Sequence, residues 1–445
     1  MKTGSSGPGF LQMGNKRGSA TVLLAMITVA MSAAVLSAIL ISRGWAVRSE
    51  SEVFGRIWAK AILSEYDRHL LEDYHIMAFH GGEYEISEKL QYYMDYSIKG
   101  KLRIRMEAPV TDLSGYEMRD PANFKKALRK SFALETADTL KNMTKRHQRD
   151  VRAGEESSNS ESRIIRNKVV LDTLPSSGIK NTVDISSLIR RMKKGEFKNI
   201  ASDSGTGMTV EMLFIRKYFN SRVTTADSKK HFFSNEMEYV LNGSADDEKN
   251  ASSCQRKIFL IRNALNLTYL YSDPEKVEIV TTAAELITPG PAGAATQALI
   301  MEAWAALEAK QDIKDLLDGG RVPLIKTSES WKTDFGSVLD SDDVKEKLYD
   351  DARRNLHENE DRLHKEDKDQ TDHSSILEGL TYDDYLTAML LIMNDNVRLL
   401  RVMDIVQINM KYRYYRDFNW EEYYGGVRFA YCVNGHRYAF KDQYR

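Results

Sequence analysis

The stretch ATVLLAMITVAMSAAVLSAILI, residues 20–41, decides how this chain is organised. It contains no charged residue, and as a helix with about 1.5 Å rise per residue it would span roughly 33 Å, enough to cross the hydrocarbon core of a membrane. Lys16 and Arg17 precede it, Arg43 follows it, and Trp45 stands where interfacial tryptophans occur. The sequence therefore predicts one membrane-spanning helix.

A cleaved signal peptide is the alternative interpretation of this stretch. The apolar region of a signal peptide is about 7–15 residues long and ends in small residues before the cleavage site. Residues 20–41 form a longer segment and continue into Ser42-Arg43-Gly44 with no clear cleavage site. We therefore expect a retained, single-pass anchor in the plasma membrane.

The orientation of the anchor does not follow from its flanking charges alone, because Arg43 and Arg48 follow it just as Lys16 and Arg17 precede it. A short basic tail before a first apolar helix usually stays in the cytoplasm, and long domains translocate largely regardless of charge. We expect residues 1–19 to form a short cytoplasmic tail and the C-terminal domain to be extracytoplasmic.

Apolar residues continue at helical spacing beyond the anchor. They recur at intervals of one, three and four residues, which is typical of one face of a helix. We expect an amphipathic extension of the anchor helix within residues 42–80, reaching about His75 and ending before Gly81-Gly82. The apolar positions are Val53, Phe54, Ile57, Trp58, Ile62, Tyr66, Leu70 and Tyr74.

Composition limits the classes of protein. The chain has 445 residues, of which 42% are hydrophobic and 29% charged, so it can bury a substantial core in one large or two ordinary domains. Its net charge of −1 gives no general attraction to nucleic acid. Cys254 and Cys432 are too few for a disulfide-rich scaffold or a four-cysteine zinc site. In an extracytoplasmic domain they could form a disulfide, or they could stay unpaired.

The remaining pattern indicates an α+β fold that is predominantly helical. Alternation in LRIRMEAPV, residues 102–110, predicts a strand, and Pro121 opens a helix to about Lys145. Further helices are predicted near 184–194, 208–220, 229–241, 255–273, 275–287 and 294–317. The predicted parts are a first part of the head at 81–145, a flexible polar linker at 146–181, a helical core at 182–339, a charged mobile segment at 340–376, and a core helix with a C-terminal β-hairpin at 377–445.

Local signals support the C-terminal part of this prediction. Thr381 can cap the start of the core helix, with Asp384 three residues later. Asn434-Gly435 lies between two alternating runs, which is a strong hairpin signal. Methionines in the helices are expected to fill the core rather than bind a metal or cofactor. They are Met301, Met389, Met393, Met403 and Met410.

Catalytic and metal-binding motifs fail on inspection. His357-Glu358 starts a zinc-protease pattern, but Asp361 stands where the second histidine belongs. Gly205-Thr206-Gly207 lacks the third glycine of a nucleotide-binding loop, and Asp184 is better explained as a helix cap than as part of a metal-dependent adhesion motif. We therefore assign no catalytic residue, metal site or cofactor, and expect that the protein is not an enzyme.

The segment Lys16-Arg17-Gly18-Ser19-Ala20-Thr21-Val22, followed at once by the apolar helix, resembles the start of TadE/TadG-like pseudopilins of the Tad (Flp) pilus. The resemblance implies a pilin-type plan, with a membrane half of the first helix and a second half that carries a globular head. It also implies prepilin-type processing at Gly18, before Ser19. Leu23 departs from this pattern, because the main prepilin substrates have a glutamate five residues after the cleaved glycine.

Further along, Glu65–Tyr74 (EYDRHLLEDY) resembles a large, functionally uncharacterised family of single-anchor bacterial proteins. Four later stretches resemble the same family. They are Asn235–Leu241, Arg262–Ser272, Pro323–Trp331 and Leu380–Met410.

Two functions are therefore compared. The first is a membrane-anchored structural or assembly protein of a Tad or type IV-like pilus or an envelope secretion system. Its partners are membrane lipid and the transmembrane helices of assembly proteins, which the small residues of the anchor let approach closely. The second is an extracellular sensor, binding domain or hydrolase without a recognisable motif. A polar pocket with perturbed carboxylates, such as Glu302 or Asp404, would favour the second.

Overall fold

The chain divides into two units, which are described separately. Unit 1 comprises Met1–Glu65, Gly81–Ser114 and Gly426–Gln443, and unit 2 comprises Tyr66–His80, Gly115–Gly425 and Tyr444–Arg445. The computed structural model describes residues 17–98, 104–134, 174–180, 183–197, 209–225, 231–339 and 379–444. The elements are mostly helices, with a long apolar helix at the N-terminus and small antiparallel sheets, so the predicted fold class is confirmed.

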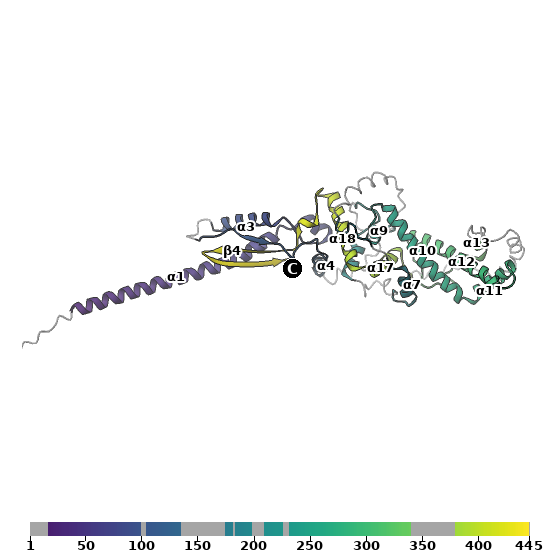
Figure 1. Ribbon diagram of the computed structural model, residues 1–445, viewed down its shortest axis with the longest axis horizontal. Helices are drawn as coiled ribbons and strands as arrows, with labels where there is room; N and C mark the ends of the chain where they lie inside the picture. The colour runs from purple at the N-terminus through teal and green to yellow at the C-terminus, as the bar shows by residue number, and fades with distance from the viewer. Residues whose placement is uncertain are drawn as a thin grey trace, which may run out of the picture. The chain divides into compact units, whose positions relative to one another are not determined.

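Unit 1 is built on α1, a continuous helix from Arg17 to Leu63 (Figure 1). It is longer than the predicted membrane span, but it does not reach His75 as expected. Asp67 has an extended backbone and caps a new helix, α2 (Arg68–Tyr74), by accepting hydrogen bonds from the N–H groups of His69 and Leu70. A capping residue is non-helical, so the chain must leave α1 before it. The extension therefore consists of two helices.

A three-stranded antiparallel sheet completes unit 1 together with α3 (Glu83–Ile98). The strand order is β2-β4-β5, with β2 at Val110–Asp112, β4 at Gly426–Val433 and β5 at His436–Gln443. The predicted hairpin is confirmed: Asn434 and Gly435 have φ values of 49° and 80° in the turn between β4 and β5. Such positive values explain why Asn-Gly is favoured at this turn. The strand predicted from LRIRMEAPV is present as a bridge at Met106 and as β2.

The larger core of unit 2 brings together segments that are distant in the sequence. Residues of α2, α4, α7, α8, α9, α10, α17 and α18 contribute to one apolar cluster, and β1 (Phe79–His80) pairs with β3 (Tyr423–Tyr424). The bounds of these helices are α4 (Pro121–Leu134), α7 (Ile185–Lys193), α8 (Val210–Tyr218), α9 (Glu236–Asn242), α10 (Asp247–Ser272), α17 (Tyr382–Ile392) and α18 (Asp395–Arg413), and a short 3-10 helix spans Trp420–Glu422.

The predicted C-terminal core helix is two helices. The Asn394 side chain accepts hydrogen bonds from the N–H groups of Asn396 and Val397, so it starts α18 anew after α17 has ended. The Thr381–Asp384 capping box at the start of α17 is confirmed in both directions. The five methionines predicted to fill the core are buried.

A second apolar cluster in unit 2 lies among three helices and α13 (Phe335–Leu339). The helices are α10 (Asp247–Ser272), α11 (Pro274–Ile287) and α12 (Gly293–Leu317), and Figure 1 shows them running alongside one another. Trp304 of α12 lies at the centre of this cluster, with Trp331 and Phe335 packed against it edge to face. All three helices were predicted.

Two predicted segments cannot be compared in full. The charged segment 340–376 lies outside the described residues, as do residues 146–173 of the predicted linker. The part of the linker that is described does not behave as a linker, because Leu174 and Ser176 are buried. Leu174 belongs to the larger core, and Ser176 is hydrogen-bonded to Asp404 of α18. The polar composition of residues 146–181 gave no sign that Leu174 and Ser176 would pack into the core.

Candidate functional site: the anchor helix and the buried charges

The N-terminal part of α1 is the first candidate, because nothing within the described residues covers it. Among these residues, α1 is the one helix long and apolar enough to cross a membrane. Its most apolar 18 residues have a mean hydropathy of 2.4, and none of this stretch is buried. Length and composition suit either a retained anchor or a signal sequence. Gly18 and Ser19, the predicted processing site, fall in the first turn of this helix.

The second part of α1 forms the core of unit 1 through its aromatic residues. Trp58 is only 2% exposed. Its ring lies 5.7 Å from that of Phe54 in a stacked arrangement and 5.2 Å from that of Tyr431 in an edge-on one. The indole N–H donates to the Ser97 hydroxyl at 3.1 Å, and the Tyr431 hydroxyl donates to the Ser51 carbonyl at 2.5 Å. The helix is thereby fixed to both α3 and β4.

A glycine allows the sheet to approach α1 closely. A Cβ atom on Gly55 would lie 2.2–2.6 Å from ring atoms of Phe440 in β5, closer than real Cβ contacts allow. A side chain at this point would displace the Phe440 ring, so glycine lets helix and sheet approach, although it weakens a helix interior by about 1 kcal/mol relative to alanine.

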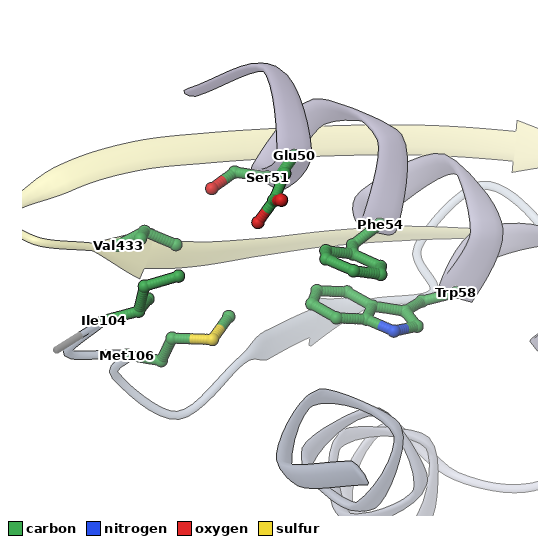
Figure 2. A pocket seen from close by; sticks show the side chains of 7 residues that line it. All are labelled: Glu50, Ser51, Phe54, Trp58, Ile104, Met106 and Val433. Atoms are coloured by element: carbon green, nitrogen blue, oxygen red, sulfur yellow. The ribbon is translucent and has the colours of Figure 1, made fainter. Parts of the chain in front are cut away.

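A small hollow opens beside the same aromatic pair (Figure 2). It is lined by apolar side chains from α1, from the segment before β2 and from β4, with one carboxylate at its edge. Phe54 and Trp58 face Met106 and Ile104 across it in Figure 2. The polar groups in this lining are the Glu50 carboxylate and the Ser51 hydroxyl, and that hydroxyl donates to the Val47 carbonyl at 2.7 Å, so the lining suits a side chain rather than a reaction. The lining residues are Glu50, Ser51, Phe54, Trp58, Ile104, Met106 and Val433.

A different face of α1 remains exposed outside the predicted span. Val53 and Ile57, one turn apart, are 51% and 52% exposed, and Trp45 is 70% exposed. Unit 1 covers Trp58 and Ala59 but leaves these side chains bare. This exposed apolar face continues the uncovered surface of the membrane segment along the same helix.

The second candidate is a group of buried charges in unit 2. Arg262 of α10 donates through Nε to Asp312 of α12 at 2.9 Å, and Lys326 approaches both Asp312 (2.7 Å) and Glu308 (2.5 Å). These four residues form the Asp312 network, and each is 3% exposed or less. Burial alone would raise the pKa of Asp312, but the charges of Arg262 and Lys326 lower it below its usual value.

The Asp312 network also holds the segment after α12. Arg262 donates to the carbonyls of Pro323 and Leu324, and Glu308 accepts from the N–H groups of Lys332 and Thr333. Buried charges thus hold both ends of this segment, at Pro323 and Leu324 and at Lys332 and Thr333.

Two further buried carboxylates have strongly raised pKa values. Burial raises the pKa of Asp404 to about 6, against hydrogen bonds from the Ser176 backbone and hydroxyl. Burial likewise raises the pKa of Glu238 to about 8, although the N–H of Arg222 donates to it at 2.8 Å. Both side chains hold loops in place. Glu302, the other carboxylate considered in the sequence, is exposed on α12.

The cysteines are free thiols in this structure. Cys254 is buried in α10, where burial raises its pKa to about 12, and Cys432 is half-buried in β4. Of the two alternatives left open by the sequence, a disulfide or unpaired cysteines, the structure has the second. Among the described residues, no group of three or more His, Cys, Asp or Glu side chains is arranged to hold a metal ion.

Sequence reasoning missed the Asp312 network. A signal was present: Arg262 and Asn266 interrupt the apolar run of α10 four residues apart, and Glu308 and Asp312 do the same in α12. Polar residues spaced by one turn on a buried helix face predict partners on a neighbouring helix. The Asp184 cap was predicted correctly, since its side chain accepts from the N–H of Ser187.

Residues 148–435 match a family described as "Family of unknown function (DUF5702)". The match covers more than half of the chain, and includes the stretches at 235–241, 262–272, 323–331 and 380–410 that resembled an uncharacterised family. It does not include α1, and its description states no pilus role. Comparisons with curated proteins and with solved structures gave no match. The chain belongs to the DUF5702 family of unknown function.

Proposed function

We propose that this protein is a membrane-anchored structural or assembly protein, pseudopilin-like in plan, of a Tad or type IV-like pilus or envelope secretion system. The observation that carries the proposal is that the two parts of α1 have different surroundings. One part of the helix is apolar and uncovered, and the other part is the spine of a small unit with an antiparallel sheet. A helix of this kind both inserts into a membrane and carries a load outside it.

The exposed apolar face of α1, at Val53 and Ile57, is evidence for a partner helix. Val53 and Ile57 would lie outside the hydrocarbon core of the membrane, in water. Burying such exposed apolar side chains against another protein lowers the free energy. Small residues in the span, including Ala30, Ala33 and Ala34, permit close helix approach within the membrane. A partner helix could therefore follow α1 from the membrane to the exposed apolar face.

The state of the carboxylates gives less support to the alternative function of an extracellular sensor or hydrolase. Asp404 has a raised pKa, as a general acid or base would, but its oxygens accept hydrogen bonds from Ser176 and Tyr239 in the core. Structural networks perturb pKa values as well as active sites do. We therefore assign Asp404 to folding rather than to chemistry.

Photo-crosslinking along α1 tests the proposal. A photoreactive amino acid at Val53 or Ile57, in cells that assemble the envelope system, is expected to give a covalent product with a single-span membrane protein or a second copy of this chain. The control is the same amino acid at Tyr271 of α10, which is 53% exposed and lies in unit 2. Equal products from Tyr271 and Val53, or none from Val53 and Ile57 in membrane-inserted protein, would contradict the proposal.

N-terminal processing is a separate part of the proposal. If a prepilin-type peptidase cuts after Gly18, the mature protein begins at Ser19, within the first turn of α1. N-terminal sequencing of protein purified from its native membrane decides this point. A mature chain that still carries Met1–Gly18 excludes processing but leaves the anchor and its partner face intact.

A further inference from the structure

One amine in unit 2 is placed between two carboxylates in the protein interior. The Nζ atom of Lys326 lies 2.7 Å from Oδ1 of Asp312 and 2.5 Å from Oε1 of Glu308. The side chains of Lys326, Asp312 and Glu308 are 2%, 0% and 0% exposed. Water is therefore excluded from the space between these three groups. This is the arrangement of a nucleophile, an electrophile and a proton carrier.

Asp312 is oriented as an electrophile. Its Oδ2 atom accepts from Nε of Arg262 and from Nδ2 of Asn266, each at 2.9 Å, while Oδ1 faces the amine. Two donors on one oxygen polarise the carboxyl group and stabilise negative charge that develops on that oxygen when its carbon is attacked. The other oxygen is left as the one to depart.

Glu308 is oriented as the proton carrier. Its carboxylate accepts from the N–H groups of Lys332 (3.2 Å) and Thr333 (2.9 Å), which fixes the side chain while Oε1 contacts the amine. A positioned carboxylate at hydrogen-bond distance can take a proton from one group and return it to another.

We propose that Lys326 and Asp312 condense to an intramolecular amide bond. Glu308 carries a proton from the lysine ammonium to Oδ1 of Asp312, which leaves a neutral amine and a neutral carboxyl group, and the amine attacks Cγ of Asp312 so that a C–N bond forms. Charge on Oδ2 in the tetrahedral intermediate is held by Arg262 and Asn266. Glu308 then carries a second proton from the attached nitrogen to the Oδ1 hydroxyl, the C–Oδ1 bond breaks, and water leaves as the charge on Oδ2 re-forms the C=O double bond. An ammonium and a carboxylate give an amide and one water, so the step balances without an oxidant or co-reactant.

The burial of the site favours this reaction. Keeping an ammonium beside carboxylates away from water carries a large desolvation cost, whereas an amide is neutral. Fixed proximity supplies the other advantage, since oriented groups react as if at very high concentration. The product would join α12 to the segment that follows it, closing a covalent ring between residues 312 and 326. This modification is independent of the proposed pilus function.

Peptide mapping of the full-length protein, purified in detergent and digested with trypsin, tests the proposal. Condensation removes one water, about 18 Da, and blocks cleavage at Lys326. The expected product is residues 311–314 (QDIK) joined to residues 322–332 (VPLIKTSESWK), about 18 Da lighter than the two peptides together. Peptide mapping is preferred to intact mass because processing at Gly18 would change the latter.

Variants locate the reaction. Lys326→Arg keeps the positive charge and is expected to abolish the joined peptide, and Glu308→Gln is expected to reduce its rate of formation about 100-fold or more. The matched control is Lys314→Arg, because Lys314 is exposed on α12 and the substitution keeps both its charge and the tryptic site. That variant should still join residues 312 and 326. Stoichiometric release of residues 322–326 from the wild-type protein would overturn the proposal and leave the network as ion pairs.

Discussion

Units 1 and 2 bury different kinds of side chain. Among the described residues of unit 1, the buried polar side chains are Ser51 and Thr111, and none of them is charged. Unit 2 hides thirteen charged side chains, among them Arg262, Asp312 and Asp404. A core of aromatic rings and a glycine tolerates many local changes, whereas each buried charge requires a specific partner. Stability should therefore depend on charge and pH in unit 2 and on shape in unit 1.

The largest effect is expected from breaking the Asp312 network. Arg262→Met leaves two buried carboxylates, Glu308 and Asp312, with Lys326 as their one remaining cation, which should lower the free energy of unfolding by about 3–5 kcal/mol. Urea denaturation followed by hydrogen exchange of α10 and α12 measures it. The matched change in unit 1 is Arg48→Met, where the partner is Glu52 and both side chains are exposed. A comparable loss from both variants would remove the contrast between the units.

The next effect concerns pH. The pKa of Asp404 rises from its ordinary value of 3.8 to about 6 on folding, mainly through burial. The folded state therefore holds the proton more tightly, and the free energy of unfolding falls as pH rises from about 4 to about 6. Asp404 should account for a fall of roughly 3 kcal/mol in the free energy of unfolding. Urea denaturation curves recorded across this pH range measure it.

Asp404→Asn provides the control for that pH dependence. The variant cannot ionise, so its urea midpoint in unit 2 should change less between pH 4 and 7 than that of the wild-type protein. Hydrogen exchange of β4 and β5 in unit 1 should be unaffected by the substitution. An unchanged pH slope in the variant would show that Asp404 does not carry the effect.

A smaller effect is expected from overfilling unit 1. Gly55→Val places methyl groups where the Phe440 ring lies, which should cost about 1–3 kcal/mol through displaced side chains. Faster hydrogen exchange in β5 would record it. The double variant Gly55→Val with Phe440→Ala should recover part of the loss. Wild-type protection in the single variant would mean that the Phe440 ring moves aside without cost and that glycine is not required at position 55.

The smallest effect concerns the capping box. Thr381→Ala removes the side chain that accepts from the N–H of Asp384 at 3.2 Å, and should lower stability by about 1 kcal/mol. Asp384 is also paired with Arg216 at 2.9 Å, which holds it in place. Thermal unfolding monitored by circular dichroism is sensitive enough. A change above roughly 3 kcal/mol would indicate that Thr381 does more than cap.

Local patterns predicted the local structure well. The Asn434-Gly435 turn, the Asp184 cap and the buried helix α10 all depend on neighbouring residues, whose conformational preferences are visible in the sequence. The break after Leu63 was missed because the apolar spacing continues through Tyr66 to Tyr74, while the Asp67 cap that interrupts it is a single residue.

Long-range pairing was beyond the same reasoning. β2 aligns with β4 in the pair Asp112 and Arg428, which are separated by most of the chain. Strand alternation shows that a segment needs a partner but does not identify it. The Asp312 network was also a long-range pairing. The polar residues on the apolar faces of α10 and α12 were visible in the sequence, but nothing there identified Lys326, which comes from the segment after α12, as their partner.

The return of the chain to β4 and β5 has a consequence for the order of folding. The aromatic face of α1 is covered by strands that are made much later, since Phe440 follows Leu63 by about 380 residues, or roughly 20–80 s of synthesis at about 5–20 residues per second. During that interval Phe54 and Trp58 lack the sheet that covers them. These aromatic side chains therefore stay without their sheet until residues 426–443 have been synthesised. Truncation before residue 426 should yield a chain whose unit 1 cannot fold and which is rapidly degraded.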